Sequence, residues 1–258
     1  MKYEAITFEI NDGLAVITLN RPDVMNAMNG QMRAEVLHAT KRAVAEARVL
    51  VMTGAGKAFC SGQDLGDARK ADQLDLERTL RDEYEPMIEA LTSAPIPVIA
   101  AVNGAAAGAG ANLALAADVV SAAKSALFLQ AFTRIGLLPD AGGTFWLPRQ
   151  IGMARAMGAA LFAEPVTAEQ AVQWGMIWEA IEDENFAAHW KARARKLADG
   201  PTFAYGQVKK ALHASAANDL NEQLTLEAAL QGECGKTRDF QEGIMAFLEK
   251  RPAQFEGR

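Results

Sequence analysis

The first fifty residues change from a two-residue hydrophobic period to a helical one. Residues 3–10 and 14–19 alternate apolar and polar side chains on either side of Asn11-Asp12-Gly13, a turn-forming tripeptide. This pattern predicts a β-hairpin. Between residues 29 and 47 the apolar positions recur every three or four residues, which predicts a helix, and Asn29 is a suitable N-cap. The chain therefore begins with a hairpin followed by an amphipathic helix.

Further along, short apolar runs with the length of buried strands alternate with helical segments. Residues 49–53 and 98–102 predict such strands, and residues 76–91 predict a helix with a possible kink at Pro86. The polar segment 64–75 has no clear period and is expected to be a loop. A succession of strand, helix and strand favours parallel crossover units, so the expected fold class is α/β.

From residue 142 onward the pattern is mainly helical, with a short strand expected at 176–181. We expect a core from residue 1 to 200 and a helical C-terminal region from 201 to 258. The apolar faces of the last helices predict that this region covers a neighbouring subunit. The expected helices span residues 144–150, 154–161, 168–173, 185–199, 203–214, 220–233 and 239–250.

Composition excludes several classes of function. The 258 residues are 50% hydrophobic and have a formal net charge of −6, which argues against a general nucleic-acid surface. The two cysteines give no disulfide framework. The N-terminus has no signal-peptide pattern, and polar residues or Gly interrupt the apolar runs well short of a membrane span. These features predict a cytoplasmic protein that has no membrane or nucleic-acid partner.

Glycine-rich turns follow both predicted strands. Gly54 to Leu65 follows the first, and Gly104 to Gly110 follows the second and leads into a helix. Such turns expose backbone N–H groups that can bind an oxygen gaining negative charge. Together they predict an oxyanion hole. Neither turn has the spacing of a phosphate loop or a dinucleotide fingerprint, and no Cys/His cluster has metal-ligand spacing, so no metal is expected.

Several motifs in this order resemble the crotonase (enoyl-CoA hydratase/isomerase) superfamily. They include Asn20-Arg-Pro-Asp-Val-Met-Asn26-Ala27, Gly62-Gln63-Asp64-Leu65, Gly108-Ala109-Gly110, Leu138-Pro-Asp-Ala-Gly-Gly-Thr144 and the C-terminal segment 239–251. The resemblance implies a spiral of ββα units with a helical C-terminal trimerisation region, and a homotrimer or a hexamer made of two trimers. It also implies an acyl-CoA thioester substrate whose carbonyl oxygen is bound by the N–H groups of Gln63 and Ala109. No separate cofactor is implied, because coenzyme A is part of the substrate.

The carboxylates of this site distinguish the possible reactions. Hydratases of the superfamily use two glutamates, and this chain has Asn112 and Phe132 at those positions. Neither side chain can exchange a proton. Asp140 lies where isomerases of the superfamily can have their acid/base carboxylate. The alternative is that Asp140 only caps the helix that begins near Gly142.

Among the isomerases, the motifs are most similar to the ring 1,2-epoxyphenylacetyl-CoA isomerases of phenylacetate degradation. That resemblance implies conversion of a ring epoxide to an oxepin, or a 3,4- to 2,3-double-bond shift in dehydroadipyl-CoA. Phe132 would then help to form an apolar pocket. The alternatives are a general enoyl-CoA isomerase, another crotonase-type enzyme such as a hydratase or a dehalogenase, and a non-catalytic acyl-CoA-binding subunit.

The resemblance also implies where coenzyme A binds. Asn26, Ala27 and the segment from Gly62 through Asp64 to Leu65 are expected to contact the adenine through their backbone. Phe247 and Lys250 are expected at the nucleotide end, often contributed by the neighbouring subunit. The alternative for Lys250 is a solvated cation in the last turn of a helix.

Overall fold

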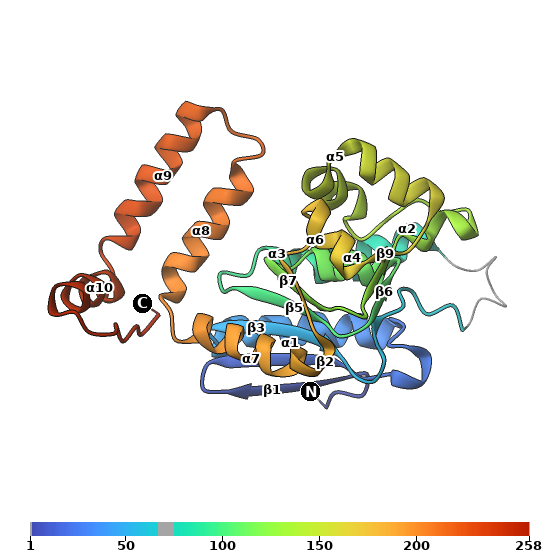
Figure 1. Ribbon diagram of the computed structural model, residues 1–258, viewed down its shortest axis with the longest axis horizontal. Helices are drawn as coiled ribbons and strands as arrows, with labels where there is room; N and C mark the ends of the chain where they lie inside the picture. The colour runs from blue at the N-terminus through green and yellow to red at the C-terminus, as the bar shows by residue number, and fades with distance from the viewer. Residues whose placement is uncertain (1, 67–74, 258) are drawn as a thin grey trace.

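A six-stranded sheet and a four-stranded sheet form the body of the molecule, as the computed structural model shows for residues 2–66 and 75–257 (Figure 1). The larger sheet has the strand order β1-β2-β3-β5-β7-β10, and the smaller has the order β4-β6-β8-β9. All neighbouring pairs are parallel except β1 with β2 and β8 with β9. Residues 67–74, within the expected loop 64–75, lie outside the described residues.

Consecutive strands alternate between the two sheets. β3 (Val49–Gly54), β5 (Val98–Val102) and β7 (Val119–Ala123) belong to the larger sheet. β4 (Ala58–Cys60), β6 (Ala105–Ala107) and β8 (Leu127–Leu129) follow them one by one in the smaller sheet. Each repeat of the chain thus adds one strand to each sheet, which is the ββα spiral expected for the crotonase fold.

The N-terminal predictions are confirmed. β1 (Ile6–Asn11) and β2 (Leu14–Leu19) form the antiparallel hairpin, and α1 (Gly30–Glu46) follows. The Asn29 side chain accepts a hydrogen bond from the Met32 N–H, so Asn29 is the N-cap. These elements agree with the sequence pattern because their signals are local.

Strand β3 has buried side chains on both of its faces. Leu50 and Met52 belong to the main core, whereas Val49 and Val51 pack in a second core with Phe186 and other residues of α7 (Asp183–Ala198). The two-residue period of a strand accounts for this alternation. A sheet covered on both faces explains why the strand sequences are nearly continuous apolar runs.

The helix expected at 76–91 is three segments. α2 (Leu76–Thr79) leads into a π-helical turn, η3 (Leu80–Tyr84), and then into α3 (Glu85–Thr92). The irregular turn ends just before Pro86. Proline has no backbone N–H to donate, and its ring clashes with the carbonyl of the preceding helical turn, so a regular α-helix is disturbed there. The prediction of a single regular helix was therefore wrong, whereas the predicted irregularity near Pro86 is confirmed.

Four short strands were missed or merged into turns, and one of them is β4, which lies within the expected turn 54–65. Residues 104–110 were expected to turn directly into a helix, yet β6 lies before α4 (Ala109–Leu115). β8 and β9 (Val166–Thr167) were not predicted, and the final strand, β10, spans only Glu179–Ile181. Strands of two or three residues contain too few alternations to give a sequence signal.

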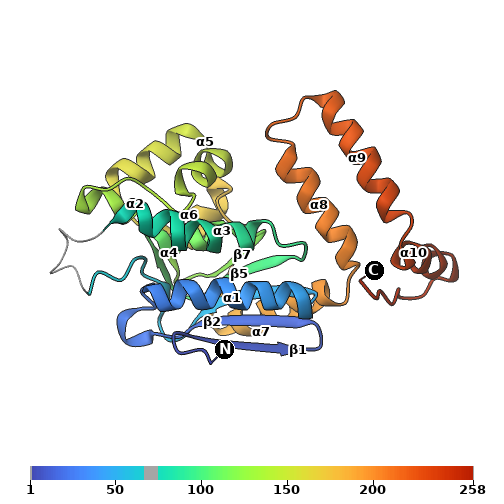
Figure 2. The same cartoon turned by 180° about the vertical axis from the view of Figure 1, so that it is seen from behind.

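The later helices follow the prediction closely. α5 (Gly143–Phe162) is interrupted at Gly152, whose φ of 75° and ψ of 161° are not helical, and α6 spans Ala168–Trp174. The C-terminal helices are α8 (Thr202–Ala214), α9 (Leu220–Cys234) and α10 (Arg238–Glu249). In both ribbon views α9 and α10 stand away from the sheets (Figures 1 and 2). No helix among the described residues is long and apolar enough to cross a membrane.

Helix α8 is fixed to the body by buried polar contacts. The Lys209 Nζ lies 2.7 Å from a carboxylate oxygen of Asp118 and donates to the Ile96 carbonyl at 3.0 Å. A Cβ atom at Gly206 would lie 2.6 Å from the Pro95 carbonyl oxygen, so helix and body approach closely there. The start of the C-terminal region is therefore held in place against the sheets.

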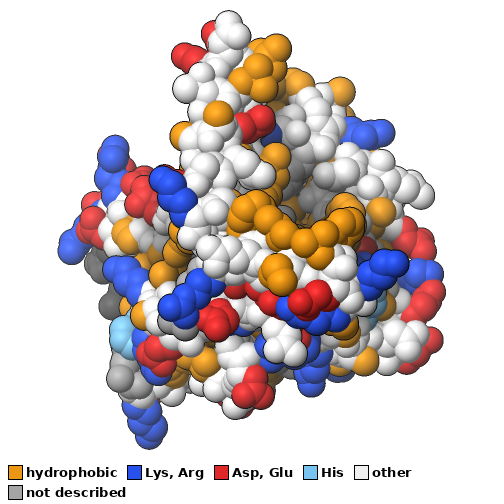
Figure 3. Space-filling model, turned by 90° about the vertical axis from the view of Figure 1, so that its left-hand side faces the viewer, with side chains coloured by type: hydrophobic (Ala, Val, Ile, Leu, Met, Phe, Trp, Pro, Cys, Tyr) orange, Lys and Arg blue, Asp and Glu red, His pale blue; other side chains and the backbone are white. Residues whose placement is uncertain are grey.

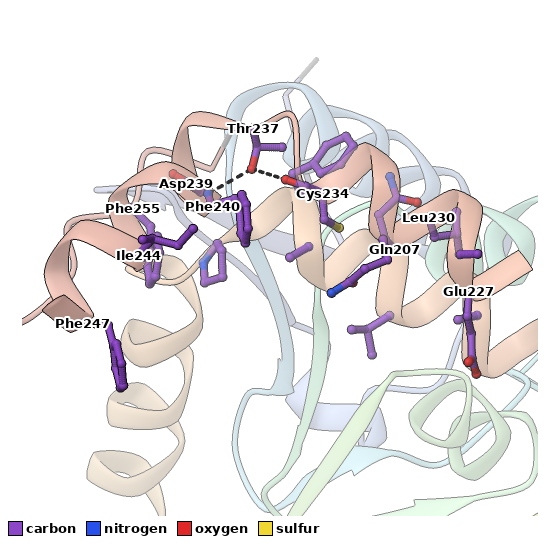
Figure 4. Close-up of a pocket in the computed structure, with 18 of the residues that line it drawn as sticks. Gln207, Glu227, Leu230, Cys234, Thr237, Asp239, Phe240, Ile244, Phe247 and Phe255 are labelled. Atoms are coloured by element: carbon purple, nitrogen blue, oxygen red, sulfur yellow. Dashed lines mark hydrogen bonds between the residues drawn. The ribbon is translucent and has the colours of Figure 1, made fainter. Parts of the chain in front are cut away.

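The three C-terminal helices enclose an apolar groove of about 890 Å³. Apolar side chains gather around a hollow on this side of the molecule (Figure 3), and the close-up shows aromatic residues of α10 beside α8 and α9 (Figure 4). The groove is lined by residues that include Phe203, Val208, Leu224, Leu230, Phe240, Ile244, Phe247 and Phe255. We call this surface the C-terminal groove.

Candidate active site

Two glycines in left-handed conformations lie directly before the expected oxyanion donors. Gly62 has a φ of 97° and precedes Gln63, and Gly108 has a φ of 53° and precedes Ala109. Only glycine adopts such angles without strain, which explains its place in both turns. A Cβ atom at Gly62 would lie 3.5 Å from the Ala109 nitrogen. The structure therefore brings the two turns together.

The backbone N–H groups of Gln63 and Ala109 have no acceptor in the described part of the chain. Met28 forms an isolated β-bridge with Gln63: the Met28 N–H donates to the Gly62 carbonyl, and the Met28 carbonyl accepts from the Asp64 N–H. The Gln63 N–H therefore points away from Met28. Ala109 is the first residue of α4, where N–H groups have no partner within the helix. Two neighbouring free donors are what an oxyanion hole requires.

A buried polar cluster that sequence reasoning missed supports the Gln63 turn. The Gln63 side-chain oxygen accepts from the Tyr84 hydroxyl at 2.6 Å and from the Arg33 guanidinium at 2.8 Å. Arg33 is 4% exposed and also pairs with Glu83 at 2.7 Å. These residues lie on α1 and η3, 21 to 30 positions from Gln63. No local sequence pattern indicated this cluster.

Asp140 has a partly buried carboxyl group, one oxygen of which accepts no hydrogen bond from the described part of the chain. Its Oδ1 atom is buried and has no hydrogen-bond partner among the described residues. Burial raises the pKa of Asp140 to about 6. Helix α5 has Gly142 as its N-cap, with no side-chain capping bond. The alternative role of Asp140 as a helix cap is therefore wrong.

Asp140 is hydrogen-bonded to the helix that follows the second glycine turn. Asn112 of α4, the helix that begins with Ala109, donates to the Asp140 carbonyl at 2.7 Å. Burial raises the pKa of Tyr84, and the negative charge of Asp140 contributes to this rise. That Gln63, Ala109 and Asp140 share one catalytic site stays a prediction.

Asn112 and Phe132 are both buried, but they have different surroundings. Asn112 is fully buried, and its amide is engaged by Asp140 and Gln130, so the structure places it behind Asp140 and out of reach of a substrate. Its expected role as a direct substrate contact needs correction. Phe132 is 7% exposed, and its ring lies 3.9 Å from the position of a Cβ atom at Gly108. It is well placed to form an apolar wall beside the oxyanion turn.

Hydrogen bonds between loops hold the segment that is expected to bind coenzyme A. Asn26 is fully buried, and its side chain donates to the Ala55 and Ala58 carbonyls and accepts from the Arg21 N–H. The Asn26 side chain therefore shapes the loop and has no surface for a ligand. Ala27 is 7% exposed, and its carbonyl accepts a hydrogen bond from Arg21.

Asp64 and Leu65 extend this segment at the surface. The Asp64 carboxylate pairs with Arg21 at 2.7 Å, and Leu65 is 48% exposed. Hydrogen bonds from the Gly66 N–H and from Arg21 lower the pKa of Asp64. Asp64 is therefore a charged group that ties the loop to Arg21, while Leu65 leaves apolar surface open beside it.

Phe247 and Lys250 are not brought to this site within one chain. Phe247 is 82% exposed and lies at the C-terminal groove (Figure 4). Lys250 ends α10 with a left-handed φ of 54°. Helix α10 belongs to the region that stands away from the sheets. If these residues contact coenzyme A, they do so at the site of a neighbouring subunit.

The described residues contain no group of three or more His, Cys, Asp or Glu side chains that could hold a metal ion. Cys60, next to the first turn, is fully buried, and burial raises the pKa of its thiol to about 12. Its sulfur lies 3.1 Å from the Asn26 carbonyl and 2.7 Å from the position of a Cβ atom at Gly110. The packing role expected for Cys60 agrees with these contacts.

Comparison with known proteins identifies the family. The model of the enoyl-CoA hydratase/isomerase family matches residues 9–258. The chain belongs to this family. The predicted crotonase resemblance and the ββα spiral are thereby confirmed. The chain is therefore an enzyme of a family that acts on acyl-CoA.

Two curated relatives are similar to this protein over its full length or nearly so. A protein from Rhodobacter capsulatus named probable enoyl-CoA hydratase is 64% identical over 100% of both chains. The 1,2-epoxyphenylacetyl-CoA isomerase of Escherichia coli is 45% identical over 99% of both chains. Among solved structures, an enoyl-CoA hydratase from Bacillus anthracis is 30% identical, with a TM-score of 0.91 over 99% of this chain and 100% of that one.

Proposed function

We propose that this enzyme is an acyl-CoA isomerase that uses Asp140 as its single acid/base group. The proposal rests mainly on one observation: the Asp140 carboxyl is partly buried with an oxygen that has no partner among the described residues, and the Asp140 backbone is hydrogen-bonded to Asn112 on α4, the helix that begins with Ala109. A pKa of about 6 suits a group that must both accept and return a proton near neutral pH.

The proposed double-bond shift needs only these three groups of the chain. The Asp140 carboxylate removes a proton from the carbon next to the thioester carbonyl, and the electrons move to the carbonyl oxygen to form an enolate. The N–H groups of Gln63 and Ala109 stabilise that oxygen, and each such donor contributes roughly 3 kcal/mol. Asp140 then returns the proton two carbons further along, which moves the double bond into conjugation. Substrate and product have the same mass, and the carboxylate is regenerated.

A hydratase would need an additional group to activate water. At the two glutamate positions of the hydratases, this chain has Asn112, whose amide is engaged, and the apolar Phe132. These residues argue against efficient hydration. The name of the Rhodobacter capsulatus relative favours hydration, so it is the second candidate. The first experiment must therefore distinguish the two reactions.

For the substrate, we propose ring 1,2-epoxyphenylacetyl-CoA, with 3,4-dehydroadipyl-CoA as a related substrate. The 45% identity to the Escherichia coli isomerase and the apolar wall formed by Phe132 support this choice. We also propose a homotrimer or a hexamer in which the C-terminal groove binds a second copy, so that Phe247 and Lys250 can reach a neighbouring site. A cytoplasmic location stays a prediction.

Product mass tests the reaction. The purified enzyme is incubated separately with ring 1,2-epoxyphenylacetyl-CoA, a 3-enoyl-CoA and a 2-enoyl-CoA, and products are followed by absorbance and mass spectrometry. The proposal predicts products of unchanged mass from the epoxide. Conversion of the 3-enoyl-CoA alone would indicate a general double-bond isomerase. A 2-enoyl product heavier by one water would indicate a hydratase, and binding without any product would indicate a non-catalytic subunit.

A further inference from the structure

The turn that holds Asp140 has an unusual backbone. The two residues after Asp140, Ala141 and Gly142, both have left-handed φ angles, of 47° and 85°. An alanine rarely adopts this conformation, and two consecutive left-handed residues need support from their surroundings. The Asp140 carboxyl has no hydrogen-bond partner at Oδ1, so that atom does not provide this support. Hydrogen bonds at this turn are instead made to the Asp140 backbone carbonyl.

Two donors bind the carbonyl oxygen of Asp140. The Gly143 N–H donates to it at 2.8 Å, closing the turn, and the Asn112 Nδ2 donates to it at 2.7 Å. The second contact joins the turn to α4, 28 positions earlier in the chain. Gly143 leaves room for it, because a Cβ atom there would lie only 2.3 Å from the Asn112 Nδ2.

Gln130 fixes the orientation of the Asn112 amide. Its Nε2 donates to the Asn112 Oδ1 at 2.9 Å, so the Asn112 oxygen faces Gln130 and its NH₂ group faces Asp140. The reverse orientation would place two donors against each other at Gln130 and two oxygens against each other at Asp140. Both amide residues are buried, at 0% and 4% exposure. Water therefore cannot readily replace either partner.

The position of Asn112 on α4 gives this contact a functional meaning. Ala109 is the first residue of α4, and Asn112 lies three residues later, about one helical turn along. Every residue of this helix is buried. One short and rigid segment thus contains an oxyanion donor at its start and binds the backbone of Asp140 one turn further on.

We propose that Asn112, oriented by Gln130, is a positioning residue that sets the distance between the Asp140 carboxyl and the oxyanion hole. The inference rests on the proposed role of Asp140 in proton transfer. Asn112 does not exchange protons or touch the substrate; it fixes the place from which Asp140 acts. Misplacing a reacting group by about 1 Å can reduce turnover by about 100-fold.

The main test is Asn112→Asp. This substitution keeps the shape and the acceptor toward Gln130, but it places an oxygen against the Asp140 carbonyl. We expect kcat to fall by about 10- to 100-fold with KM changed by less than about threefold. The pH at which kcat/KM is half-maximal is compared in Gln130→Met, because the added carboxyl of Asn112→Asp shifts this pH by its own charge. A merely structural role would lower the melting temperature and leave kcat and KM unchanged below that temperature.

Gln130→Met tests the same link without altering Asn112 and serves if Asn112→Asp does not fold. It removes the donor to Asn112 while retaining the volume of the side chain, and we expect a smaller loss in kcat. Thr40→Val is the matched control. Thr40 is 1% exposed on α1, and its Oγ1 is buried without a partner among the described residues, so the change should leave turnover as in the wild type.

Asp140→Asn in the same assay separates the two levels of the proposal. Loss of turnover in Asp140→Asn, with wild-type kcat in Asn112→Asp and Gln130→Met and a wild-type pH profile in Gln130→Met, would overturn the positioning role alone. Full turnover by Asp140→Asn would overturn the proposed function and the positioning role together. Reduced kcat in all three variants, with KM and the Thr40→Val control unaffected, is the expected result.

Discussion

The site around Asp140 and the C-terminal groove differ in how far a single chain provides partners for their polar groups and cover for their apolar side chains. Around Asp140, many buried polar groups have partners from distant parts of the chain. The groups without a partner among the described residues include the Gln63 and Ala109 donors and the Asp140, Gln130 and Trp146 side-chain atoms Oδ1, Oε1 and Nε1. In the groove, large apolar side chains such as Phe240 and Phe247 remain 49% and 82% exposed. The first region is built for a small ligand and the second for a protein surface.

This difference indicates that folding and assembly depend on separate residues. Changes in the turns should destroy or disable the subunit, whereas changes in the groove should release subunits that still fold. The contact of Lys209 with Asp118 and Ile96 fixes only the start of the C-terminal region to the body. The following variants test this separation.

The largest effect is expected from Gly110→Val. A Cβ atom at Gly110 would lie 2.4 Å from the Cys60 carbonyl oxygen and 2.7 Å from its sulfur, so α4 would have to move away from β4. We expect little or no soluble protein, as judged by expression and thermal unfolding. Gly158→Ala in α5 is the control, because no atom lies within 4 Å of its Cβ position. A soluble Gly110→Val enzyme with wild-type turnover would show that the two turns need not approach so closely.

The groove is tested by Phe240→Asp. A carboxylate in the apolar contact should dissociate the proposed trimer, with a monomeric mass in analytical ultracentrifugation and a retained far-ultraviolet circular dichroism spectrum. Leu220→Asp is the control, since Leu220 is 73% exposed and lies outside the residues that line the groove. A wild-type protein that is already monomeric would contradict the proposed role of the groove.

A pH profile of the wild type tests the charge state of Asp140. The raised pKa of about 6 predicts that the reactive carboxylate is lost as pH falls through this value. Because the base must be ionised to accept a proton, kcat/KM should decline about tenfold per pH unit below pH 6 and level off above it. A flat profile from pH 5 to about 8 would exclude Asp140 as the base.

The smallest effect concerns stability. Burial raises the pKa of Asp140 in the folded state above its ordinary value, so folding favours the protonated form and stability falls as pH rises from about 4 to 6. Asp140→Asn removes this cost. Its free energy of unfolding at pH 7 to 8 should exceed that of the wild type by roughly 1 kcal/mol, after allowance for solvent screening. Urea unfolding should show a smaller difference at pH 4; equal differences at both pH values would contradict the assignment.

The sequence predicted the parts of the molecule that have local signals. The helix after Asn29, the strands 49–53 and 98–102 and the glycine turns were recognisable because period, cap and turn residues lie close together in the chain. Asp140 was found from its motif, and its helix-cap alternative was excluded only by the geometry of Gly142. Short strands such as β8 escaped because three residues show no reliable period.

The supporting residues of the site could not be predicted from local patterns. Arg33 and Tyr84 hold Gln63 across 30 and 21 positions, and Asn112 holds Asp140 across 28. No sequence period reports contacts between such distant residues. The replacement of a hydratase glutamate by Asn112 indicated the loss of one activity, but only the structure showed the contact that the amide makes in its place.

The most direct test of the account compares turnover and binding in wild type and Asp140→Asn. Conversion of ring 1,2-epoxyphenylacetyl-CoA is measured by mass spectrometry, and affinity is measured by calorimetry with a non-reactive acyl-CoA thioester. The account predicts that turnover falls by at least about 100-fold while Kd stays within about threefold, because the oxyanion donors remain. Unchanged turnover in Asp140→Asn, or an equal loss of binding and turnover, would contradict the claim that Asp140 acts as the proton carrier.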